Sequence, residues 1–476
     1  MVSTLSSTQP STQSSLRYLE TDSTESPNQR ILPLSARVNK LDHLEVGGCD
    51  VLDLVEEFGS PLYILDETTL RTACQQYRQA FDQYYPGEAL VMYASKAWNC
   101  LAVCAIATQE GLAIDVVSGG ELLTALNAGA SPDNIYFHGN NKSRRELQQG
   151  IKAGCRIVVD NWHELKTLSV LASADKPVTV LLRLTPGIEC HTHEYIQTGH
   201  IDSKFGFDPD QLEEVFAYLA QQTSLVCIGL HAHIGSQIFE LQPHEDLSGV
   251  LVHWMEAAKR HGLPIRELDV GGGLGIRYTE TDDPPSITAW VQVVCEHMVK
   301  ACQVADVPLP RLICEPGRSL IGSACVTAYT VGSQKTVPGI RTYISIDGGM
   351  SDNPRPITYQ SVYRVLAAGN MSAPLSETVT LAGKHCESGD VVIHDAQLPI
   401  VSSGDIVVIS ATGAYNYSMA SNYNRVPRPA AVLVQNAQAC LIVERETEAD
   451  LIRYDRLPDY LGGASSEALA ESIPSP

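Results

Sequence analysis

The sequence predicts a (β/α)8, TIM-like barrel followed by a second, all-β domain. Eight short apolar and often β-branched runs lie between residues 90 and 316, separated by longer polar or amphipathic segments. The first five begin about 22 residues apart, which is the length of one strand–helix unit. Beyond residue 318 strand-like runs follow one another with glycine or proline in the gaps, a pattern typical of a Greek-key barrel or sandwich.

The predicted strands fall into two sets. Those of the barrel are Leu90–Ser95, Ala113–Ser118, Ile135–Gly139, Arg156–Asp160, Val178–Thr185, Cys227–Ile234, Glu267–Gly271 and Leu312–Pro316. Those of the β domain are Val326–Val331, Arg341–Ile346, Glu377–Ala382, Asp390–Ala396, Asp405–Ser410 and Ala431–Val434. A further run, Pro61–Leu65, precedes the barrel and can pair with either domain. We therefore expect a strand-bearing segment at 39–66, the barrel at 67–317 and the β domain at 318–476.

Composition excludes several classes of partner. The 476 residues carry a formal net charge of −22, which disfavours binding to nucleic acid and to anionic membranes. No apolar stretch reaches the roughly 18 residues that a transmembrane helix needs. Thirteen scattered cysteines without a CxxC pair form neither a disulfide nor a zinc framework, so a reducing cytoplasm is expected.

Residues 1–38 are rich in Ser, Thr, Gln and Pro and contain few large apolar side chains. Such a segment cannot offset the entropy of ordering, which predicts a disordered tail. An organelle transit peptide is the functional alternative, but Arg17 is the only basic residue before Arg30, and acidic residues are present.

Polar residues recur at or just beyond the carboxyl ends of the eight barrel runs. They are Lys96, Asp115 with Ser118, His138, Asp160 with Asn161, Arg183, His233 with Ser236, Gly271–Gly273, and Glu315 with Arg318. In a barrel these ends converge on one mouth, where active sites are built. The sequence therefore predicts one shared site.

Lys96 is the only Lys or Arg between Arg78 and Lys142 and follows the apolar run that begins at Ala89. Lys96 is either a surface side chain with its amine in water or a residue whose amine takes part in catalysis. A buried lysine loses its proton readily and then attacks carbonyl groups.

Three further features fit one cofactor. The glycine-rich run Gly271–Gly273 in the seventh unit can bind phosphate through its backbone N–H groups. His231 and His233 alternate on a strand and face the same side, where an imidazole can stack on an aromatic ring. The alternative is that both are core histidines with their hydrogen bonds satisfied. Glu315, held in a Pro-Gly turn, can keep a pyridine nitrogen protonated, or else forms a surface pair with Arg318. With Lys96 these features describe pyridoxal 5'-phosphate.

Cys190, His191, His193 and Glu194 are metal ligands by residue type. Their spacing lacks a matching second ligand pair, so no metal is expected and a loop over the barrel mouth is the alternative.

Several motifs in order resemble the alanine-racemase-like, barrel-type pyridoxal-phosphate decarboxylases over roughly residues 41 to 440. They are Tyr93-Ala-Ser-Lys96-Ala, Asp115-Val-Val-Ser-Gly-Gly-Glu121, His138-Gly-Asn-Asn-Lys142, His191-Thr-His-Glu-Tyr-Ile-Gln-Thr-Gly199, Lys204-Phe-Gly-Phe, His231-Ala-His-Ile-Gly-Ser-Gln237, Gly271-Gly-Gly, Glu315-Pro-Gly-Arg318, Arg355-Pro-Ile-Thr-Tyr359, Cys386-Glu-Ser-Gly-Asp390 and Gly413-Ala-Tyr415.

This resemblance implies a cofactor site in which Lys96 forms the covalent link, His233 stacks on the ring and Glu315 contacts its nitrogen. The other cofactor-binding residues that it implies are Asp115, His138, Ser236, Gly271, Gly272, Gly273, Pro316, Gly317, Arg318 and Tyr415. It also implies that the segment before the barrel contributes to the β domain. The active unit would be a head-to-tail homodimer, in which Cys386, the proton donor, and Glu387 enter the partner's site.

The substrate-binding residues implied by analogy are Arg318, Arg355, Tyr359, Glu387 and Tyr415. An arginine left unpaired in a dry pocket penalises ornithine, which lacks a distal carboxylate, by several kcal/mol. This favours decarboxylation of meso-2,6-diaminopimelate to L-lysine and CO2, the last step of lysine biosynthesis. The alternatives are an ornithine or arginine decarboxylase, a racemase, for which Cys386 and Glu387 are unsuited, and a non-catalytic homologue that binds the cofactor. For Arg355 the alternative is a surface charge in a Pro-flanked loop.

Overall fold

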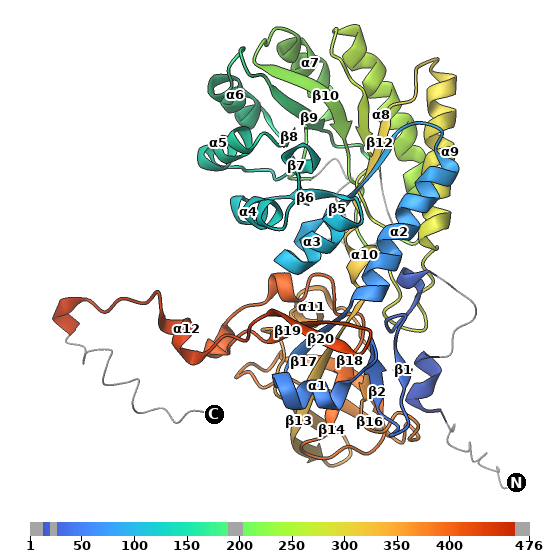
Figure 1. The fold of residues 1–476 in the computed structure, drawn as a ribbon, viewed down its shortest axis with the longest axis vertical. Coiled ribbons are helices and arrows are strands. Elements are labelled where there is room, and N and C mark those ends of the chain that lie inside the picture. Colours follow the sequence, from blue (N-terminus) through green and yellow to red (C-terminus); the bar gives the residue numbers. More distant parts are fainter. Residues whose placement is uncertain (1–12, 20–25, 189–202, 462–476) are drawn as a thin grey trace, which may run out of the picture.

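The computed structural model describes residues 13–19, 26–188 and 203–461, and they form a barrel joined end to end with a β domain (Figure 1). No helix within these residues has the length and apolar character that crossing a bilayer requires. The prediction of a TIM-like barrel with a separate β domain is confirmed. The domain boundaries themselves stay a prediction.

The barrel closes through eight parallel strands in the order β10-β11-β12-β5-β6-β7-β8-β9. Each predicted run overlaps one of them: β5 (Ala89–Ala94), β6 (Ala113–Val116), β7 (Ile135–Phe137), β8 (Arg156–Val159), β9 (Val178–Arg183), β10 (Leu225–His231), β11 (Glu267–Asp269) and β12 (Arg311–Cys314). The observed strands end two or three residues earlier than most predicted runs, so the polar residues after them lie in loops at the mouth.

Helices surround the barrel and explain why its strands are apolar on both faces (Figure 1). They are α2 (Glu67–Tyr84), α3 (Leu101–Gln109), α4 (Gly119–Asn127), α5 (Arg144–Ala153), α6 (Trp162–Leu171), α7 (Leu212–Ala220), α8 (Gln242–Arg260) and α9 (Ile287–Val304). Polar residues after the strands also start helices. The side chains of Ser118 and Asn161 accept backbone N–H bonds at the first turns of α4 and α6, so these two mouth loops are short and fixed.

The β domain is one nine-stranded sheet. Its main order is β17-β16-β14-β13-β4-β19-β20, and β18 pairs with both β13 and β15. The strands are β4 (Leu62–Asp66), β13 (Cys325–Val337), β14 (Arg341–Ile346), β15 (Val365–Ala367), β16 (Glu377–Ala382), β17 (Val391–Leu398), β18 (Ile406–Ile409), β19 (Ala430–Gln435) and β20 (Gln438–Val443). The six predicted runs are all present. The strands β15 and β20 were not predicted, because β15 is only three residues long and β20, which has no buried residue, lacks a clear alternating pattern.

The strand that precedes the barrel belongs to the β domain. β4 pairs antiparallel with β13 and parallel with β19, so it lies in the centre of that sheet. It connects through Asp66, whose side chain caps α2, directly into the barrel. This agrees with what the family resemblance implied and places the start of the barrel against the sheet.

The prediction of a disordered tail over residues 1–38 is wrong for residues 26–38. Leu32 and Asn28 are both completely buried. The Asn28 amide nitrogen donates to the carbonyl oxygens of Gly275 (3.1 Å) and Pro285 (2.9 Å). Composition misses such a segment because polar side chains bonded to distant backbone order it, rather than an apolar core of its own.

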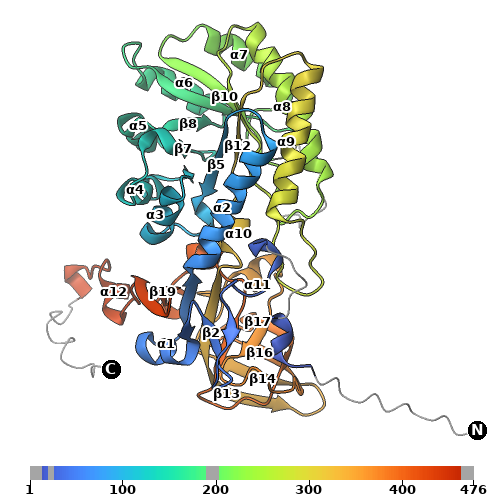
Figure 2. The ribbon, with the colours of Figure 1, turned by 45° about the vertical axis from the view of Figure 1, so that its right-hand side comes forward.

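The remaining elements lie around the β domain or between it and the barrel. The strands β1 (Arg37–Val38), β2 (Leu44–Val46) and β3 (Cys49–Asp50) form a small sheet followed by α1 (Val51–Phe58). Two short helices, α10 (Arg318–Ile321) and α11 (Arg355–Tyr359), begin with arginines that prove important below. The last helix, α12 (Glu448–Ile452), extends away from both domains (Figure 2).

Candidate active site

A cavity of about 840 Å³ opens at the carboxyl ends of the barrel strands, where the barrel meets the β domain. The predicted site residues that line it are Lys96, His138, His233, Ser236, Gly273, Glu315, Gly317, Arg318, Arg355, Tyr359 and Tyr415. Asp115, Gly271, Gly272 and Pro316 lie directly behind this lining or beside it in the chain, whereas Cys386 and Glu387 do not line the cavity. One pocket thus gathers most of the predicted residues.

Lys96 lies in a single helical turn directly after β5. Its Nζ is 3.9 Å from Oδ2 of Asp115, which is buried on β6. Burial lowers the pKa of Lys96, but Asp115 and Tyr415 raise it, and the net shift is upward. The amine is therefore held as an ammonium beside a carboxylate that can accept its proton, in contrast to the neutral amine expected from burial alone.

Glu315 follows β12 and lies between two imidazoles. Its Oε1 is 2.9 Å from Nε2 of His138, and its Oε2 is 3.4 Å from Nε2 of His231. Burial opposes ionisation of Glu315, but the two histidines hold its pKa well below the usual range. Burial also lowers the pKa of His231 to about 4, so a neutral ring faces a buried carboxylate.

His231 is a site residue to which the sequence analysis assigned no role. The alternation of His231 and His233 correctly indicated a shared side, and both line the cavity. The signal that would have found it is its position at the last residue of β10, the same position that singled out its neighbours.

His138, His231 and Glu315 each offer a ligand atom, all within 4.8 Å of one another, and they are the only such set among the described residues. Two histidines and a carboxylate also occur in catalytic zinc sites. A zinc ion at these three residues would give no role to Lys96 or to the glycine loop. A cofactor with a charged pyridine nitrogen beside Glu315 would give a role to both.

The glycine loop packs tightly against the other groups. A Cβ on Gly272 would lie 2.3 Å from the backbone oxygen of Glu315, and one on Gly271 would lie 2.7 Å from Nδ1 of His233. Gly271 and Gly273 also have positive φ angles of 66° and 124°, which L side chains rarely adopt. The loop must therefore be glycine, and its backbone can approach a bound phosphate closely.

His233 presents a neutral ring to the cavity. The backbone N–H of Gly272 donates to its Nδ1 at 3.2 Å, and burial, Lys96 and Arg183 together lower its pKa well below normal. A neutral imidazole with one nitrogen fixed from behind is suited to stacking against a flat cofactor.

The far end of the cavity is basic. Arg318 donates from Nη2 to Ser236 Oγ at 2.9 Å and from Nη1 to the Tyr278 hydroxyl at 2.6 Å. Arg355 donates to the same hydroxyl from Nη1 at 3.1 Å. Tyr415, at a φ of 60°, lies under Arg318 with 4.8 Å between Cζ and the ring centre. Its N–H bonds to the oxygen of Ala97, so the β domain contacts the lysine turn.

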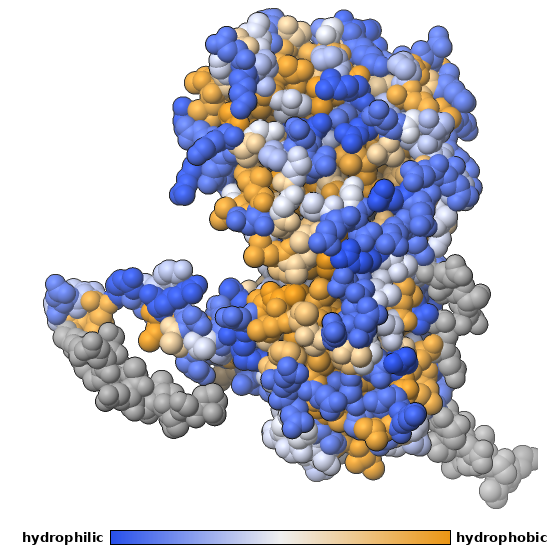
Figure 3. All heavy atoms as spheres, in the orientation of Figure 1, coloured by the Kyte–Doolittle hydropathy of each residue, from blue (hydrophilic) through white to orange (hydrophobic). Residues whose placement is uncertain are grey.

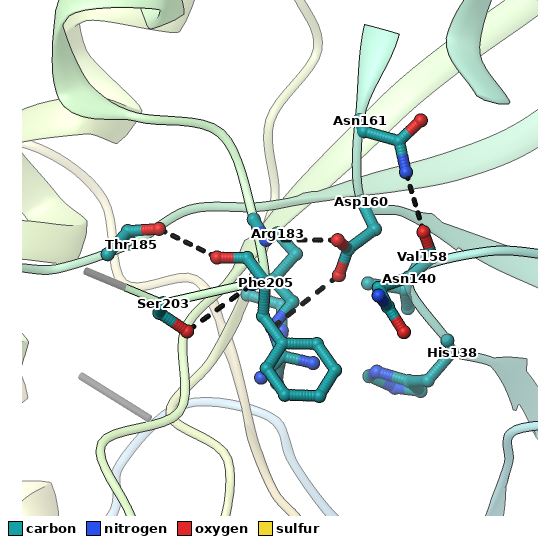
Figure 4. A network of polar contacts seen from close by, with 12 residues as sticks. His138, Asn140, Val158, Asp160, Asn161, Arg183, Thr185, Ser203 and Phe205 are labelled. Carbon is teal, nitrogen blue, oxygen red and sulfur yellow. Dashed lines mark hydrogen bonds and ion pairs between the residues drawn. The ribbon is translucent and has the colours of Figure 1, made fainter. Parts of the chain in front are cut away.

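Arg183 lines another side of the cavity, and Figure 4 shows it beside Asp160 and Phe205. Its Nε is 3.8 Å from Asp160 Oδ2, and the ring of Phe205 covers the guanidinium at 4.2 Å. Asp160 also accepts the N–H of Gly206, so this carboxylate fixes both the arginine and the segment that carries the phenylalanine. The suspected metal ligands Cys190, His191, His193 and Glu194 lie outside the described residues.

Cys386 and Glu387 lie on an exposed loop of the β domain. The Cys386 N–H donates to the side chain of Asn424, and the Glu387 N–H donates to the oxygen of His385. Neither residue lines the cavity of its own chain.

These residues fit pyridoxal phosphate at each of its reactive parts. The cavity supplies an amine for the aldehyde at Lys96 and a buried carboxylate for the ring nitrogen at Glu315. It also supplies a glycine loop with an adjacent arginine for the phosphate.

Comparison with known proteins gives the same result. Residues 67–322 match the family described as "Pyridoxal-dependent decarboxylase, pyridoxal binding domain". The chain is 64% identical to a diaminopimelate decarboxylase of Synechocystis sp., covering 95% of this chain and 98% of that one. It is 46% identical to the Bacillus subtilis protein of that name, covering 88% and 97%.

Solved structures agree. A diaminopimelate decarboxylase from M. jannaschii in complex with L-lysine superposes with a TM-score of 0.83 at 32% identity, covering 90% of this chain and 99% of that one. One from Helicobacter pylori, also complexed with L-lysine, gives 0.78 at 30% identity, covering 85% and 98%. Because both sequence and fold match over nearly the full length, the chain belongs to the diaminopimelate decarboxylases of the pyridoxal-dependent decarboxylase family.

Proposed function

We propose that this chain decarboxylates meso-2,6-diaminopimelate to L-lysine and CO2 in the cavity at the barrel mouth. The observation that carries the proposal is that one pocket holds an amine and a carboxylate at one end and two arginines at the other. Lys96 and Glu315 lie at the barrel end, and Arg318 and Arg355 at the other. A substrate with a reacting amino acid group at one end and a carboxylate at the other matches this arrangement.

The barrel end would hold the cofactor. Lys96 offers the amine for the covalent link, with Asp115 as the nearest group to take its proton. His233 would lie against the ring, and the negative charge of Glu315 would favour a proton on the ring nitrogen. When bound, pyridoxal phosphate supplies a sink for the electron pair that loss of CO2 leaves on the substrate's α-carbon.

The phosphate end and the remaining cofactor contacts involve residues predicted from the family. Ser236, Gly273, the Glu315–Arg318 turn and Tyr415 would bind the phosphate. Asp115 and His138 would order Lys96 and Glu315 from behind, and Gly271, Gly272, Pro316 and Gly317 would shape the wall. The tight glycine packing and the buried His138–Glu315 contact support these roles.

The basic end would select the substrate. Among the described residues, Arg318 and Arg355 have no carboxylate partner, and the Nε of Arg355 is buried without a hydrogen-bond partner. A distal carboxylate would satisfy these donors, with Tyr359 and Tyr415 beside it. Ornithine would leave them unpaired, and such sites reject the incomplete analogue by about 10⁴-fold or more.

Release of CO2 from meso-diaminopimelate, ornithine and arginine tests the substrate directly. We expect turnover of meso-diaminopimelate and at most trace turnover of the other two. Faster release from ornithine would contradict the proposal.

We infer that the active unit is a homodimer in which Cys386 and Glu387 complete the partner's site. Both residues are exposed and lie outside the lining of the active-site cavity of their own chain. The exposed apolar side chains of Ile357 and Tyr423 lie next to this loop, because Ile357 packs on Gly389 and Tyr423 adjoins Asn424. Figure 3 also shows apolar side chains gathered near the junction of the two domains. Such surfaces favour association. Cys386 would return a proton to the α-carbon, and Glu387 would bind the distal amine.

Mixing two inactive variants tests the shared site. Lys96→Ala and Cys386→Ala each lose activity alone, but a mixed dimer has one site with both native residues. Random exchange should then restore about a quarter of the wild-type activity. No recovery in a mixture that contains verified mixed dimers would show that each site is built from one chain.

We also propose a cytoplasmic location. Each of the twelve cysteines among the described residues is a free thiol, as expected in a reducing compartment. Export followed by disulfide formation in the isolated protein, seen by mass spectrometry, would contradict it.

A further inference from the structure

Tyr278 lies between the two arginines that the proposed function assigns to the substrate. It lies in the loop after the glycine run, is 6% exposed and lines the cavity. Its hydroxyl oxygen accepts one hydrogen bond from Arg318 and one from Arg355, at 2.6 Å and 3.1 Å. A single phenol therefore joins a helix of the barrel mouth, α10, to one of the β domain, α11.

This position matters because two like charges share one dry pocket. The guanidinium carbons of Arg318 and Arg355 lie 5.9 Å and 5.2 Å from the Tyr278 ring centre. Their mutual repulsion is strong where water is excluded, and an acceptor oxygen between them offsets it. Burial alone would raise the pKa of Tyr278, but the two arginines lower it, which shows how strongly they attract this oxygen.

Other hydrogen bonds of Arg318 and Arg355 add to those with Tyr278. Arg318 uses Nε and Nη2 on Ser236, and Arg355 uses Nη2 on Ser361 at 3.0 Å. Nη1 of each arginine donates to Tyr278, and Nη1 of Arg355 also lies 3.5 Å from the oxygen of Ala414. The buried Nε of Arg355 has no hydrogen-bond partner. The phenol thus fixes the rotation of both guanidinium planes.

The rest of the loop holds Tyr278 in place. The backbone N–H groups of Tyr278 and Thr279 donate to Asp282 Oδ2 at 3.0 Å and 2.8 Å. The N–H of Arg277 donates to the oxygen of Asn28. The ring meets Tyr363 edge-on at 5.3 Å. A side chain fixed at its backbone, ring and hydroxyl can in turn orient others.

We propose that Tyr278 is a positioning residue that sets recognition of the distal carboxylate by holding Arg318 and Arg355 at a fixed spacing and rotation. The inference rests on the proposed substrate. It adds a residue that acts through the two arginines and that selects between ligands with and without this carboxylate.

The test compares two ligands that differ only in that group, L-lysine and cadaverine, as competitive inhibitors of meso-diaminopimelate turnover. In Tyr278→Phe we expect KM for meso-diaminopimelate and the inhibition constant of L-lysine to rise about tenfold or more. The inhibition constant of cadaverine and kcat should change by less than about threefold, since no group at the reacting end is altered.

Tyr363→Phe is the matched control. It removes a buried hydroxyl from the ring that touches Tyr278, but this hydroxyl bonds to Asn416 rather than to an arginine. It should leave the ratio of the two inhibition constants unchanged. If the Tyr278 variant does not fold, Asp282→Asn, which loosens the same loop, replaces it, with a smaller change of the same ratio expected.

The outcomes separate this inference from the proposed function. No turnover of meso-diaminopimelate by the unmodified protein refutes the function itself. Turnover by the unmodified protein with an unchanged inhibitor ratio in the Tyr278 variant refutes the positioning role. A parallel rise for both inhibitors refutes it as well, because general damage would affect both.

Discussion

The two ends of the cavity are built on different plans. At the barrel end, Lys96, His138, His231 and Glu315 each follow or end a barrel strand, and their charges are matched within 4 Å. At the basic end, Arg318, Tyr278 and Arg355 come from a turn, a long loop and a separate domain. There, two positive charges share a neutral phenol rather than a carboxylate.

This difference separates chemistry from selection. A balanced set of buried charges is complete without substrate and can hold a cofactor permanently. An unbalanced pair of arginines would be completed by a bound anion, so we expect it to discriminate between ligands. Changes at the barrel end should therefore affect every substrate, and changes at the basic end should affect one class.

Lys96→Ala should have the largest effect. Removing the amine should lower kcat about 10⁴-fold or more for every amino acid that the enzyme accepts. The visible absorbance of covalently bound cofactor should disappear with it.

Lys166→Ala is the control, because this lysine lies over the Trp162 ring and outside the cavity. It should retain both activity and absorbance. If Lys96→Ala kept the absorbance of the unmodified protein, the assignment of the barrel end would be wrong.

Arg355→Lys should have an intermediate effect confined to the basic end. A lysine cannot reproduce the fixed fork of an arginine, so kcat/KM for meso-diaminopimelate should fall on the order of 100-fold. Turnover of ornithine, which has no distal carboxylate, should fall much less or not at all.

Arg364→Lys is the matched control. Arg364 also lines the cavity but is already paired with Glu280 at 2.6 Å, so its replacement should alter neither substrate by more than about threefold. Equal losses for both substrates in Arg355→Lys would show that the two ends are not independent.

Glu121→Gln should have the smallest effect and should appear only in stability. Burial raises the pKa of Glu121, whose carboxylate accepts the N–H of Val117 beside the lysine turn, to about 7. The Glu121 carboxyl group therefore contributes fully to the free energy of unfolding below its unfolded pKa, near 4.5. This contribution is lost as the pH rises through 7. Glutamine stays neutral, so the variant should gain on the order of 2–3 kcal/mol relative to wild type between pH 5 and 8.

Thermal melting of both proteins across that range measures the difference. Glu146→Gln should show the opposite sign, because bonds from Ser143 and Gly119 outweigh partial burial and lower the pKa of Glu146. The Glu146 carboxylate contributes to the free energy of unfolding above its unfolded pKa, and this contribution is lost as the pH falls. A melting difference for Glu121→Gln that does not vary with pH would contradict a buried neutral acid at this position.

Much of the barrel end could be predicted from local pattern. Apolar runs of about 22-residue spacing identify the strands, and a barrel brings the residues after them together whatever the loops contain. This is why Lys96, His138 and Glu315 were found. His231 was assigned no role because a histidine there could equally be a core residue, although its position at the end of β10 matches that of Arg183 at the end of β9.

The basic end and the N-terminal segment were harder to predict. Tyr278 has no distinguishing pattern in its loop, and its role depends on two arginines from other elements. The predicted disordered tail overlooked Asn28, which bonds to Gly275 across 247 residues of sequence. Such contacts leave no local signature because each partner is polar and unremarkable in its own segment.

The sequence by itself determined the eight strands, the β domain and the residues that meet at the barrel mouth, because strand periodicity and strand ends are local properties. Strand periodicity alone left open which domain β4 joins, although the family resemblance implied the second. Only the tertiary structure decided that residues 26–38 are ordered and that Tyr278 lies between Arg318 and Arg355. Those outcomes depend on which distant segments meet, and that is determined by packing and by the pairing of buried polar groups over the whole chain.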